Sequence, residues 1–279
     1  MQTVKAALED AMAAIDRVDA HVLVAHVLDV NRAWIAANPM HVLTETQDAR
    51  IDTLVAQRSL GHPVAYLLGA REFYGRDFAV SPDVLIPRPE TETLVEAALD
   101  FLRHCRESGN PSVLDLGTGS GAIAVTLACE RPQLAIVATD ASAAALDVAR
   151  ANARAHGCAD RIRFARGSWY EAVPGLAFDL IVANPPYVAA GDAHLAEGDL
   201  RFEPASALTD GSADGLDSIR AIVAGAAAHL VAGGTLLFEH GYDQAEAAAR
   251  VLEAAGFDER IALADLAGIP RVAGGRKIA

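Results

Sequence analysis

The chain has 279 residues, of which 52% are hydrophobic and 22% are charged. This is the composition of a globular protein with enough apolar material for a large core. The net charge of −14 argues against a protein whose affinity comes mainly from nucleic-acid phosphates. We therefore expect no direct nucleic-acid partner.

Two further signals bound the environment of the chain. No apolar run reaches the roughly 18 residues of a membrane span, and the N-terminal stretch lacks the pattern of a signal peptide, so we expect no membrane partner. The cysteines form no CxxC pair and stand far apart, at Cys105, Cys129 and Cys158. This spacing favours a reducing cytoplasm over a disulfide framework. The histidine pattern predicts no metal site.

The first part of the chain has a helical pattern with no convincing strand. Apolar residues recur at three- and four-residue spacing between residues 3 and 68, which predicts a small all-α domain over residues 1–70. Aromatic and β-branched residues then alternate around Gly75 and the Ser81–Pro82–Asp83 turn. This change predicts a β-hairpin that links two units, over residues 71–90.

From residue 91 onward, strands and helices alternate. Pro87 and Pro89 precede a predicted helix over 91–105, and further helices are predicted over 122–129, 142–156, 216–230 and 244–255. Apolar strands are predicted over 112–117, 134–140, 161–168, 178–187 and 233–241, and an irregular stretch covers 189–212. This alternation predicts an α/β domain over 91–279, with a parallel sheet covered by helices on both faces.

A glycine-rich turn joins the first strand of this domain to its helix. Gly117, Gly119 and Gly121 allow a tight turn and a close approach of a ligand to the backbone. Asp140 ends the next strand about 20 residues later, where a carboxylate can accept both hydroxyls of a ribose. A purely structural turn and a helix-capping Asp140 are the competing interpretations. NAD dehydrogenases share both features, so the turn alone leaves the chemistry open.

The run Asn184–Pro185–Pro186–Tyr187 ends the fourth predicted strand. If the first and fourth strands flank the switch point of the sheet, this run faces the glycine turn across one crevice. The Asn184 side-chain oxygen and the Pro185 carbonyl could accept the two N–H groups of a planar NH2, and the Tyr187 ring could lie against its flat face. The prolines would hold these acceptors in place. A plain proline-rich turn is the alternative.

The spacing GTGSG, with Asp115 two residues before it, resembles that of class I S-adenosylmethionine (SAM)-dependent methyltransferases. The resemblance implies a Rossmann-like fold with a mostly parallel seven-stranded sheet. It also implies that SAM is the cofactor, with S-adenosylhomocysteine as product. The residues that would contact SAM are Gly117, Thr118, Gly119, Ser120, Gly121, Asp140, Trp169 and Asn184.

Further segments narrow the resemblance to the release factor glutamine methyltransferases of the PrmC (HemK) family. They are GHPVAYLLGAREFYG, VLIPRPETE, RFEPASALTDGSADGL, FEHGYDQ and DLAGIPR. The resemblance implies methylation of the side-chain amide nitrogen (N5) of the GGQ glutamine in class 1 peptide-chain release factors. It assigns catalysis to Asn184, Pro185 and Tyr187, glutamine binding to Asn184, Pro185, Pro186 and Tyr187, and docking of the release factor to the helical domain. Arg88, Glu90 and Glu203 lie in matching segments, where a structural role is at least as good an interpretation. We expect a monomer.

Three alternatives stay open at this point. An N6-adenine DNA or RNA methyltransferase would need a basic groove and carries DPPY more often than NPPY. A glutamine methyltransferase that acts on a ribosomal protein shares NPPY but lacks the PRPETE form. A non-enzymatic SAM-binding module would not need the intact Asn184–Tyr187 run.

Overall fold

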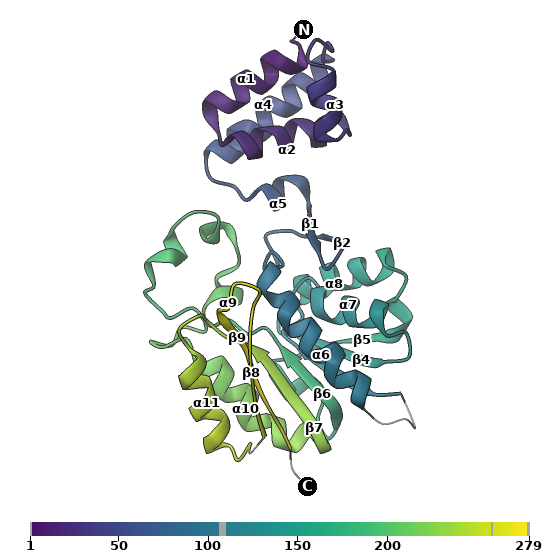
Figure 1. The fold of residues 1–279 in the computed structure, drawn as a ribbon, viewed down its shortest axis with the longest axis vertical. Helices are drawn as coiled ribbons and strands as arrows, with labels where there is room; N and C mark the ends of the chain where they lie inside the picture. The colour runs from purple at the N-terminus through teal and green to yellow at the C-terminus, as the bar shows by residue number, and fades with distance from the viewer. Residues whose placement is uncertain (1, 106–109, 258, 278–279) are drawn as a thin grey trace. The chain divides into compact units, whose positions relative to one another are not determined.

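The computed structural model describes residues 2–105, 110–257 and 259–277. The chain forms two compact units (Figure 1). The smaller unit contains the chain up to Ala70 together with Gly198–Phe202. The larger unit contains Arg71–Glu197 and the chain from Glu203 onward.

The smaller unit is helical. Its five α-helices are α1 (Val4–Ala14), α2 (Arg17–Leu28), α3 (Arg32–Ala37), α4 (Glu45–Ser59) and α5 (Val64–Leu68). A polar side chain caps the N-terminus of each of the first four, where backbone N–H groups lack partners within the helix; these caps are Thr3, Asp16, Asn31 and Thr44. The apolar faces meet in a core made of Val4, Ala7, Val24, Ile35, Leu43 and Ile51.

A short segment from far along the chain completes this unit. The 3-10 turn η5 (Leu200–Phe202) packs the Phe202 ring on His62, with ring centroids 4.2 Å apart. Arg58 of α4 donates to Asp19 at 2.6 Å and to Asp199 at 2.7 Å. One guanidinium therefore ties the returning segment to α2 and α4.

A two-stranded hairpin, β1 (Ala70–Phe73) and β2 (Arg76–Ala79), follows the helices. Tyr74 and Gly75 both have positive φ, as a tight hairpin turn requires. The hairpin is shorter than expected, because residues 80–88 contain a turn and no strand. Asn152 holds the end of β2 by exchanging hydrogen bonds with the backbone of Ala79, at 2.8 and 3.0 Å.

The larger unit is built on a seven-stranded sheet with the order β5-β4-β3-β6-β7-β9-β8. The strands are β3 (Ser112–Leu116), β4 (Ala135–Asp140), β5 (Ile162–Arg166), β6 (Phe178–Ala183), β7 (Leu230–Glu239), β8 (Glu259–Ala264) and β9 (Pro270–Arg276). β3 to β7 pair in parallel, and β9 pairs antiparallel with both of its neighbours. The expected mostly parallel sheet of seven strands is confirmed, although the sequence patterns had located only its first five strands.

Helices cover both faces of this sheet. The α-helices are α6 (Glu92–His104), α7 (Ala122–Glu130), α8 (Ala143–Ala155), α9 (Ala205–Leu208), α10 (Asp217–His229) and α11 (Ala245–Ala254). Short 3-10 turns lie between them: η1 (Pro89–Thr91), η2 (Ala159–Arg161), η3 (Trp169–Ala172) and η4 (Ala193–Ala196).

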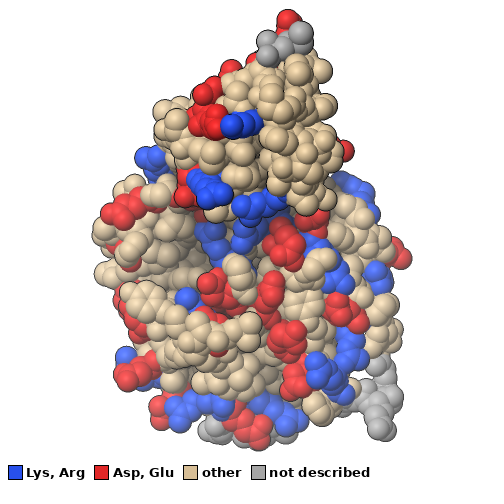
Figure 2. Space-filling view, turned by 45° about the horizontal axis from the view of Figure 1, so that its top comes forward, with Lys and Arg blue, Asp and Glu red and all other residues tan. Residues whose placement is uncertain are grey.

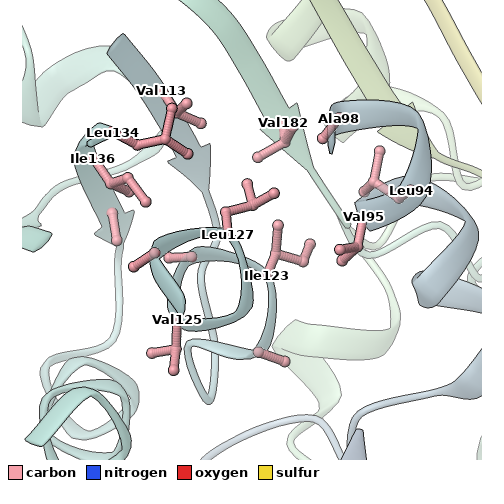
Figure 3. Packing of buried hydrophobic residues seen from close by; sticks show 14 of the residues in the cluster. Leu94, Val95, Ala98, Val113, Ile123, Val125, Leu127, Leu134, Ile136 and Val182 are labelled. Atoms are coloured by element: carbon pink, nitrogen blue, oxygen red, sulfur yellow. The ribbon is translucent and has the colours of Figure 1, made fainter. Parts of the chain in front are cut away.

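Successive residues of each central strand point to opposite faces of the sheet. Val113 and Val182 pack on one face with the buried residues of α6 and α7 (Figure 3). Leu114 and Ile181 pack on the other face with residues of α10 and α11. The central strands are therefore buried on both sides and hold a fixed register. No helix in the described part of the chain is long and apolar enough to cross a membrane.

Candidate active site

The candidate site lies at the topological switch point of the sheet, where the strand order reverses between β3 and β6. β3 and β6 are neighbours, and their last residues, Leu116 and Ala183, are paired. The chain leaves β3 toward β4 on one side and leaves β6 toward β7 on the other, so the carboxyl ends of these two strands open a crevice. This confirms that the glycine turn and the Asn184–Tyr187 run follow adjacent strands.

A cavity of about 380 Å³ occupies this crevice, a size typical of small-molecule sites. Eight of the predicted site residues line it: Gly117, Thr118, Gly119, Ser120, Asp140, Trp169, Asn184 and Pro186. Gly121, Pro185 and Tyr187 are next to them in the chain but do not line the cavity. Another wall comes from the segment 82–91 and from Pro204, Ser206 and Ala207, and residues next to the glycine turn, Asp140 and Trp169 complete the lining.

The glycine turn is shaped by its backbone. Gly117, Gly119 and Gly121 all have positive φ, between 55° and 82°. Gly121 also allows close packing, because a Cβ there would lie 3.1 Å from the Cβ of Ala149 in α8. The N–H groups of Gly117 and Thr118 both donate to the Thr139 carbonyl at 2.9 Å, which fixes the turn against β4.

Asp140 connects the turn to the next strand. Its Oδ2 accepts from the Gly119 N–H at 3.0 Å and its Oδ1 accepts from the Ser142 N–H at 2.8 Å. The carboxylate therefore supports the turn as well as lining the cavity. Each oxygen has a second lone pair, so these bonds leave capacity to accept hydroxyl groups of a ligand.

Asp115 lies beneath the turn and is fully buried. Its Oδ2 accepts from the Thr118 hydroxyl at 2.7 Å, whereas its Oδ1 has no hydrogen-bond partner. Burial raises the pKa of this carboxyl to about 7 from an ordinary value of 3.8, because the charged form loses its hydration.

Trp169 begins the turn η3 and has a φ of 46°, which is uncommon for a large side chain. Ser168 and Glu171 form a capping box that holds this turn. The Trp169 ring reaches toward the glycine turn, since a Cβ on Gly117 would lie 3.6 Å from its Cζ3 atom. The ring thus forms one flat wall of the cavity.

The Asn184 side chain is held from one end. Its Nδ2 donates to the Thr91 hydroxyl at 3.0 Å. Its Oδ1 is buried but has no hydrogen-bond partner. An unpaired buried carbonyl oxygen is costly, and here it belongs to a residue that lines the cavity, so the oxygen is available to a ligand N–H.

Tyr187 is held by a buried acid instead of lining the cavity. Its hydroxyl donates to Glu239 Oε1 at 3.0 Å, and burial together with this carboxyl raises the pKa of the phenol. Glu239 is 1% exposed, and its burial raises the pKa of the carboxyl. The hydrogen bond from Tyr187 opposes that shift, because it favours the ionised form of the carboxyl, whereas Oε2 of Glu239 has no hydrogen-bond partner.

The backbone after Pro186 is clamped by Gln244. Its Nε2 donates to the Tyr187 carbonyl at 2.9 Å and to the Asp214 carbonyl at 3.0 Å. Its Oε1 accepts from the Gly241 N–H at 2.8 Å. One buried amide therefore connects the Asn184–Tyr187 run to the start of α10 and to the loop after β7.

An ion pair closes another wall. Arg88 pairs with Glu203, whose side chain is fully buried, and the Ile86 N–H donates to Glu203 Oε2 at 2.9 Å. Arg88 itself lines the cavity. Its ion pair with Glu203 connects the segment 82–91 to the residues that follow Phe202. The interpretation of Arg88 and Glu203 as a structural salt bridge agrees with these contacts.

Sequence reasoning assigned no role to Thr91, Glu239 or Gln244. Their partners lie 52 to 93 residues away in the chain, so no local spacing reveals them. The available signal was a polar residue at the end of an apolar strand, as in Glu239 after the buried run Thr235–Phe238. Among the described residues, no group of three or more His, Cys, Asp or Glu side chains is placed to hold a metal ion.

Comparison with known proteins covers nearly the whole chain. The family model described as "Methyltransferase small domain" matches residues 95–212, and the one described as "PrmC N-terminal domain" matches residues 1–69. The Release factor glutamine methyltransferase of Xylella fastidiosa is 52% identical over 262 residues, which are 94% of this chain and 94% of that protein. The protein of the same name from Burkholderia pseudomallei is 52% identical over 267 residues, 94% of this chain and 92% of that protein.

A solved structure supports the fold. The methyltransferase from Pyrococcus furiosus aligns with 85% of this chain and 100% of its own, with 17% sequence identity and a TM-score of 0.53. At that identity the likeness concerns the fold alone. The curated relatives show more, because identity of about half extends over both units, and the chain belongs to the family of release factor glutamine methyltransferases.

Proposed function

We propose that this protein transfers the methyl group of SAM to the side-chain amide nitrogen (N5) of the glutamine in the GGQ motif of class 1 peptide-chain release factors. The observation that carries the proposal is the 52% identity over 94% of both chains with a Release factor glutamine methyltransferase. The site supports the proposal independently. Its crevice has a carboxylate and an aromatic ring that suit a nucleoside, and the unpaired side-chain oxygen of Asn184 can accept a hydrogen bond from the amide of a substrate.

The residues around the crevice fit SAM as the cofactor. SAM supplies an electrophilic methyl group on a positively charged sulfur. The flat Trp169 ring suits the adenine, the Asp140 carboxylate suits the ribose hydroxyls, and the turn from Gly117 to Gly121 leaves room for the amino-acid part. The buried, unpaired oxygen of Asn184, a residue that lines the cavity, is an acceptor that such a polar ligand would need.

Asn184 explains why the acceptor is an amide nitrogen. An amide NH2 is a poor nucleophile, since its lone pair is delocalised. The free Oδ1 of Asn184 would accept one N–H. The carbonyl of Pro185, the next residue of the run, would be the acceptor for the other. These contacts orient the nitrogen and stabilise the positive charge that develops on it during transfer. Tyr187 contributes by holding the run in place through Glu239.

We assign release-factor docking to the helical domain over residues 1–70, with residues 71–90 as linker and 91–279 as the catalytic domain. The match of residues 1–69 to an N-terminal domain model of this family supports the assignment. The acidic net charge supports a protein substrate over a nucleic acid. In Figure 2, acidic and basic side chains are interspersed on the part of the larger unit in view. We propose a cytoplasmic monomer that binds no nucleic acid.

The test uses the purified full-length chain, SAM with an isotopically labelled methyl group, and a bacterial class 1 release factor. We expect label on the release factor, and peptide mass spectrometry should place one methyl group on the GGQ glutamine. A release factor with Gln→Ala at that position should accept none. Transfer to adenine in DNA or RNA, or to a ribosomal protein in preference to the release factor, would overturn the proposal.

A further inference from the structure

We infer that Tyr170 is a positioning residue, which holds the Trp169 ring at the cavity because its own ring is fixed in a notch on α10. The inference rests on the proposed binding of SAM, since it explains what keeps the wall for the adenine in place. Tyr170 follows Trp169 directly in the turn η3 but does not line the cavity. It packs instead against the buried cluster that contains the apolar residues of α10.

A single glycine makes the notch on α10. The helix has the sequence DSIRAIVAGAAAH, so Gly225 lies in an alanine-rich stretch although glycine is a poorer helix former than alanine. Gly225 has no positive φ that would call for glycine. What it supplies is space, because a Cβ there would lie 2.3 Å from Cε2 and 2.4 Å from Cδ2 of Tyr170. The Tyr170 ring therefore lies directly on the backbone of the helix.

Two further contacts fix the Tyr170 ring in this notch. Its hydroxyl donates to the Ile222 carbonyl of α10 at 2.7 Å. Burial raises the pKa of the phenol, so the hydroxyl keeps the proton that it donates. The ring also stacks on His229, with centroids 4.4 Å apart and planes inclined by 18°. His229 is held in turn, because its Nδ1 donates to the Gly225 carbonyl at 3.0 Å.

These contacts act on Trp169 because both residues belong to one short turn. Trp169 has a φ of 46°, a conformation that a large side chain keeps only where its surroundings hold it. The two ends of the turn touch, since a Cβ on Gly167 would lie 2.8 Å from the Ala172 nitrogen. Trp169 could therefore leave its conformation only if Tyr170 left the notch. Tyr170 thus fixes the indole ring from outside the cavity.

The first test fills the notch. We expect Gly225→Ala to raise the Kd for SAM roughly 5- to 10-fold, because the added methyl group displaces Tyr170 and the stacking wall that it holds. At saturating SAM, kcat should change less than about threefold. In a Tyr170→Ala background the clash is absent, and Gly225→Ala should change the Kd less than about twofold. Alanine favours the helix, so weaker binding would not come from a weakened α10. An unchanged Kd in Gly225→Ala, or an equal loss in both backgrounds, would overturn the inference.

The second test asks whether Tyr170 acts through Trp169. Tyr170→Phe keeps the ring and removes the hydroxyl, and we expect it to raise the Kd for SAM about threefold. Tyr170→Ala removes the ring as well and should raise the Kd about tenfold. In a Trp169→Ala background, each change should alter the Kd less than about twofold, because the ring that Tyr170 positions is missing. A role in general packing would weaken binding by the same factor in both backgrounds, and that result would refute the role assigned to Tyr170.

A third measurement needs neither SAM nor turnover. The chain has 2 tryptophans, so a Trp34→Phe background leaves Trp169 as its one indole fluorophore. The fast component of its time-resolved anisotropy reports motion of the ring, and its amplitude should be at least about twofold larger when Gly225→Ala is added. Equal amplitudes would contradict the inference. If the wild type binds no SAM, the proposed function has failed, while the anisotropy still tests whether Tyr170 in its notch holds the Trp169 ring.

Discussion

At the scale of single residues, the aromatic wall of the cavity depends on an unfavourable backbone conformation. Trp169 has a φ of 46°, a region that costs a non-glycine residue about 1–3 kcal/mol and is concentrated at functional sites. The capping box of Ser168 and Glu171 holds the turn in which it lies. The rest of the turn therefore stabilises a conformation that places the indole ring on the cavity.

We expect Trp169→Ala to raise the Kd for SAM about tenfold, because stacking of a base on an aromatic ring is worth about 1–3 kcal/mol. At saturating SAM, kcat should change less than about threefold. Isothermal titration calorimetry measures the first quantity and methyl transfer the second. The chain has 2 tryptophans, so fluorescence offers a control. A response to SAM should persist in Trp34→Phe and vanish in Trp169→Phe, and an unchanged Kd would contradict the assignment.

Asp115 makes the stability of the fold depend on pH. Its pKa is about 7 in the folded protein, against an ordinary 3.8 in the unfolded chain. Between these values the folded state binds the extra proton, so this group's contribution to stability is lost as pH rises through the folded pKa. We expect the free energy of unfolding of the wild type to fall by on the order of 2–3 kcal/mol from about pH 5 to pH 8, relative to Asp115→Asn. Urea unfolding at each pH tests this, and parallel pH profiles would contradict it.

At the scale of elements, the Asn184–Tyr187 run keeps its shape because its neighbours leave it no room to move. Gly215 precedes α10 with a φ of 66°, and a Cβ there would lie 2.1 Å from the Tyr187 carbonyl oxygen. Gln244 at the start of α11 donates to the same oxygen. The run is thus fixed by a close backbone approach and by a buried amide, in addition to its own two prolines.

We expect Gly215→Ala to displace the run and to lower kcat roughly 10- to 100-fold, because small misplacements of a catalytic group are costly. The Kd for SAM should change less than about threefold, since Gly215 does not line the cavity. Gly211→Ala is the matched control. It shares a positive φ, 82°, but its Cβ would meet nothing within 4 Å. Equal losses in both variants would show that backbone strain, and not the clash with Tyr187, causes the effect.

The smaller unit depends on a segment that is distant in sequence, through Arg58. Its side chain is 22% exposed and binds Asp19, Asp199 and the His62 carbonyl. We expect Arg58→Met to destabilise this unit by about 1–2 kcal/mol, an amount reduced by the solvent screening of the half-exposed Asp199. Urea unfolding followed by Trp34 fluorescence, in a Trp169→Phe background, reports on this unit.

The control for Arg58 is Arg150→Met, which breaks an exposed pair with Asp147 in the larger unit. The Trp34 transition should not shift in this variant, because surface ion pairs contribute little. If Arg58→Met also leaves the transition unchanged, the returning segment Gly198–Phe202 is not held by this guanidinium. Added salt should narrow the difference between the wild type and Arg58→Met.

At the scale of the whole molecule, the sequence predicts those parts of the fold and the site that follow from a local pattern of residues. The glycine turn, Asp140 and the Asn184–Tyr187 run were located because each ends an apolar strand, and parallel strands present their ends at one edge. The last two strands escaped because they lack that pattern. β8 is mostly exposed, and β9 contains the sequence AGG, which is weak for a strand.

Side-chain contacts between residues that lie far apart in the sequence could not be predicted. Thr91 precedes α6 and Glu239 ends β7, and only the folded sheet brings Thr91 to Asn184 and Glu239 to Tyr187. The same holds for Phe202, which joins helices that lie far behind it in the chain. Such contacts follow from topology, and a single sequence carries no periodic signal for them.

The assignment of release-factor docking to the helical domain yields the last prediction. Met40 is 71% exposed and Val42 is 51% exposed, and both lie in the segment between α3 and α4. Exposed apolar side chains of this size suit burial against a protein partner. We expect Met40→Glu/Val42→Glu to raise KM for the release factor about tenfold, with kcat and the Kd for SAM nearly unchanged. Leu266→Glu adds charge at a fully exposed apolar residue of the larger unit and is the control. A change in KM of the same size in both variants would place the docking surface elsewhere.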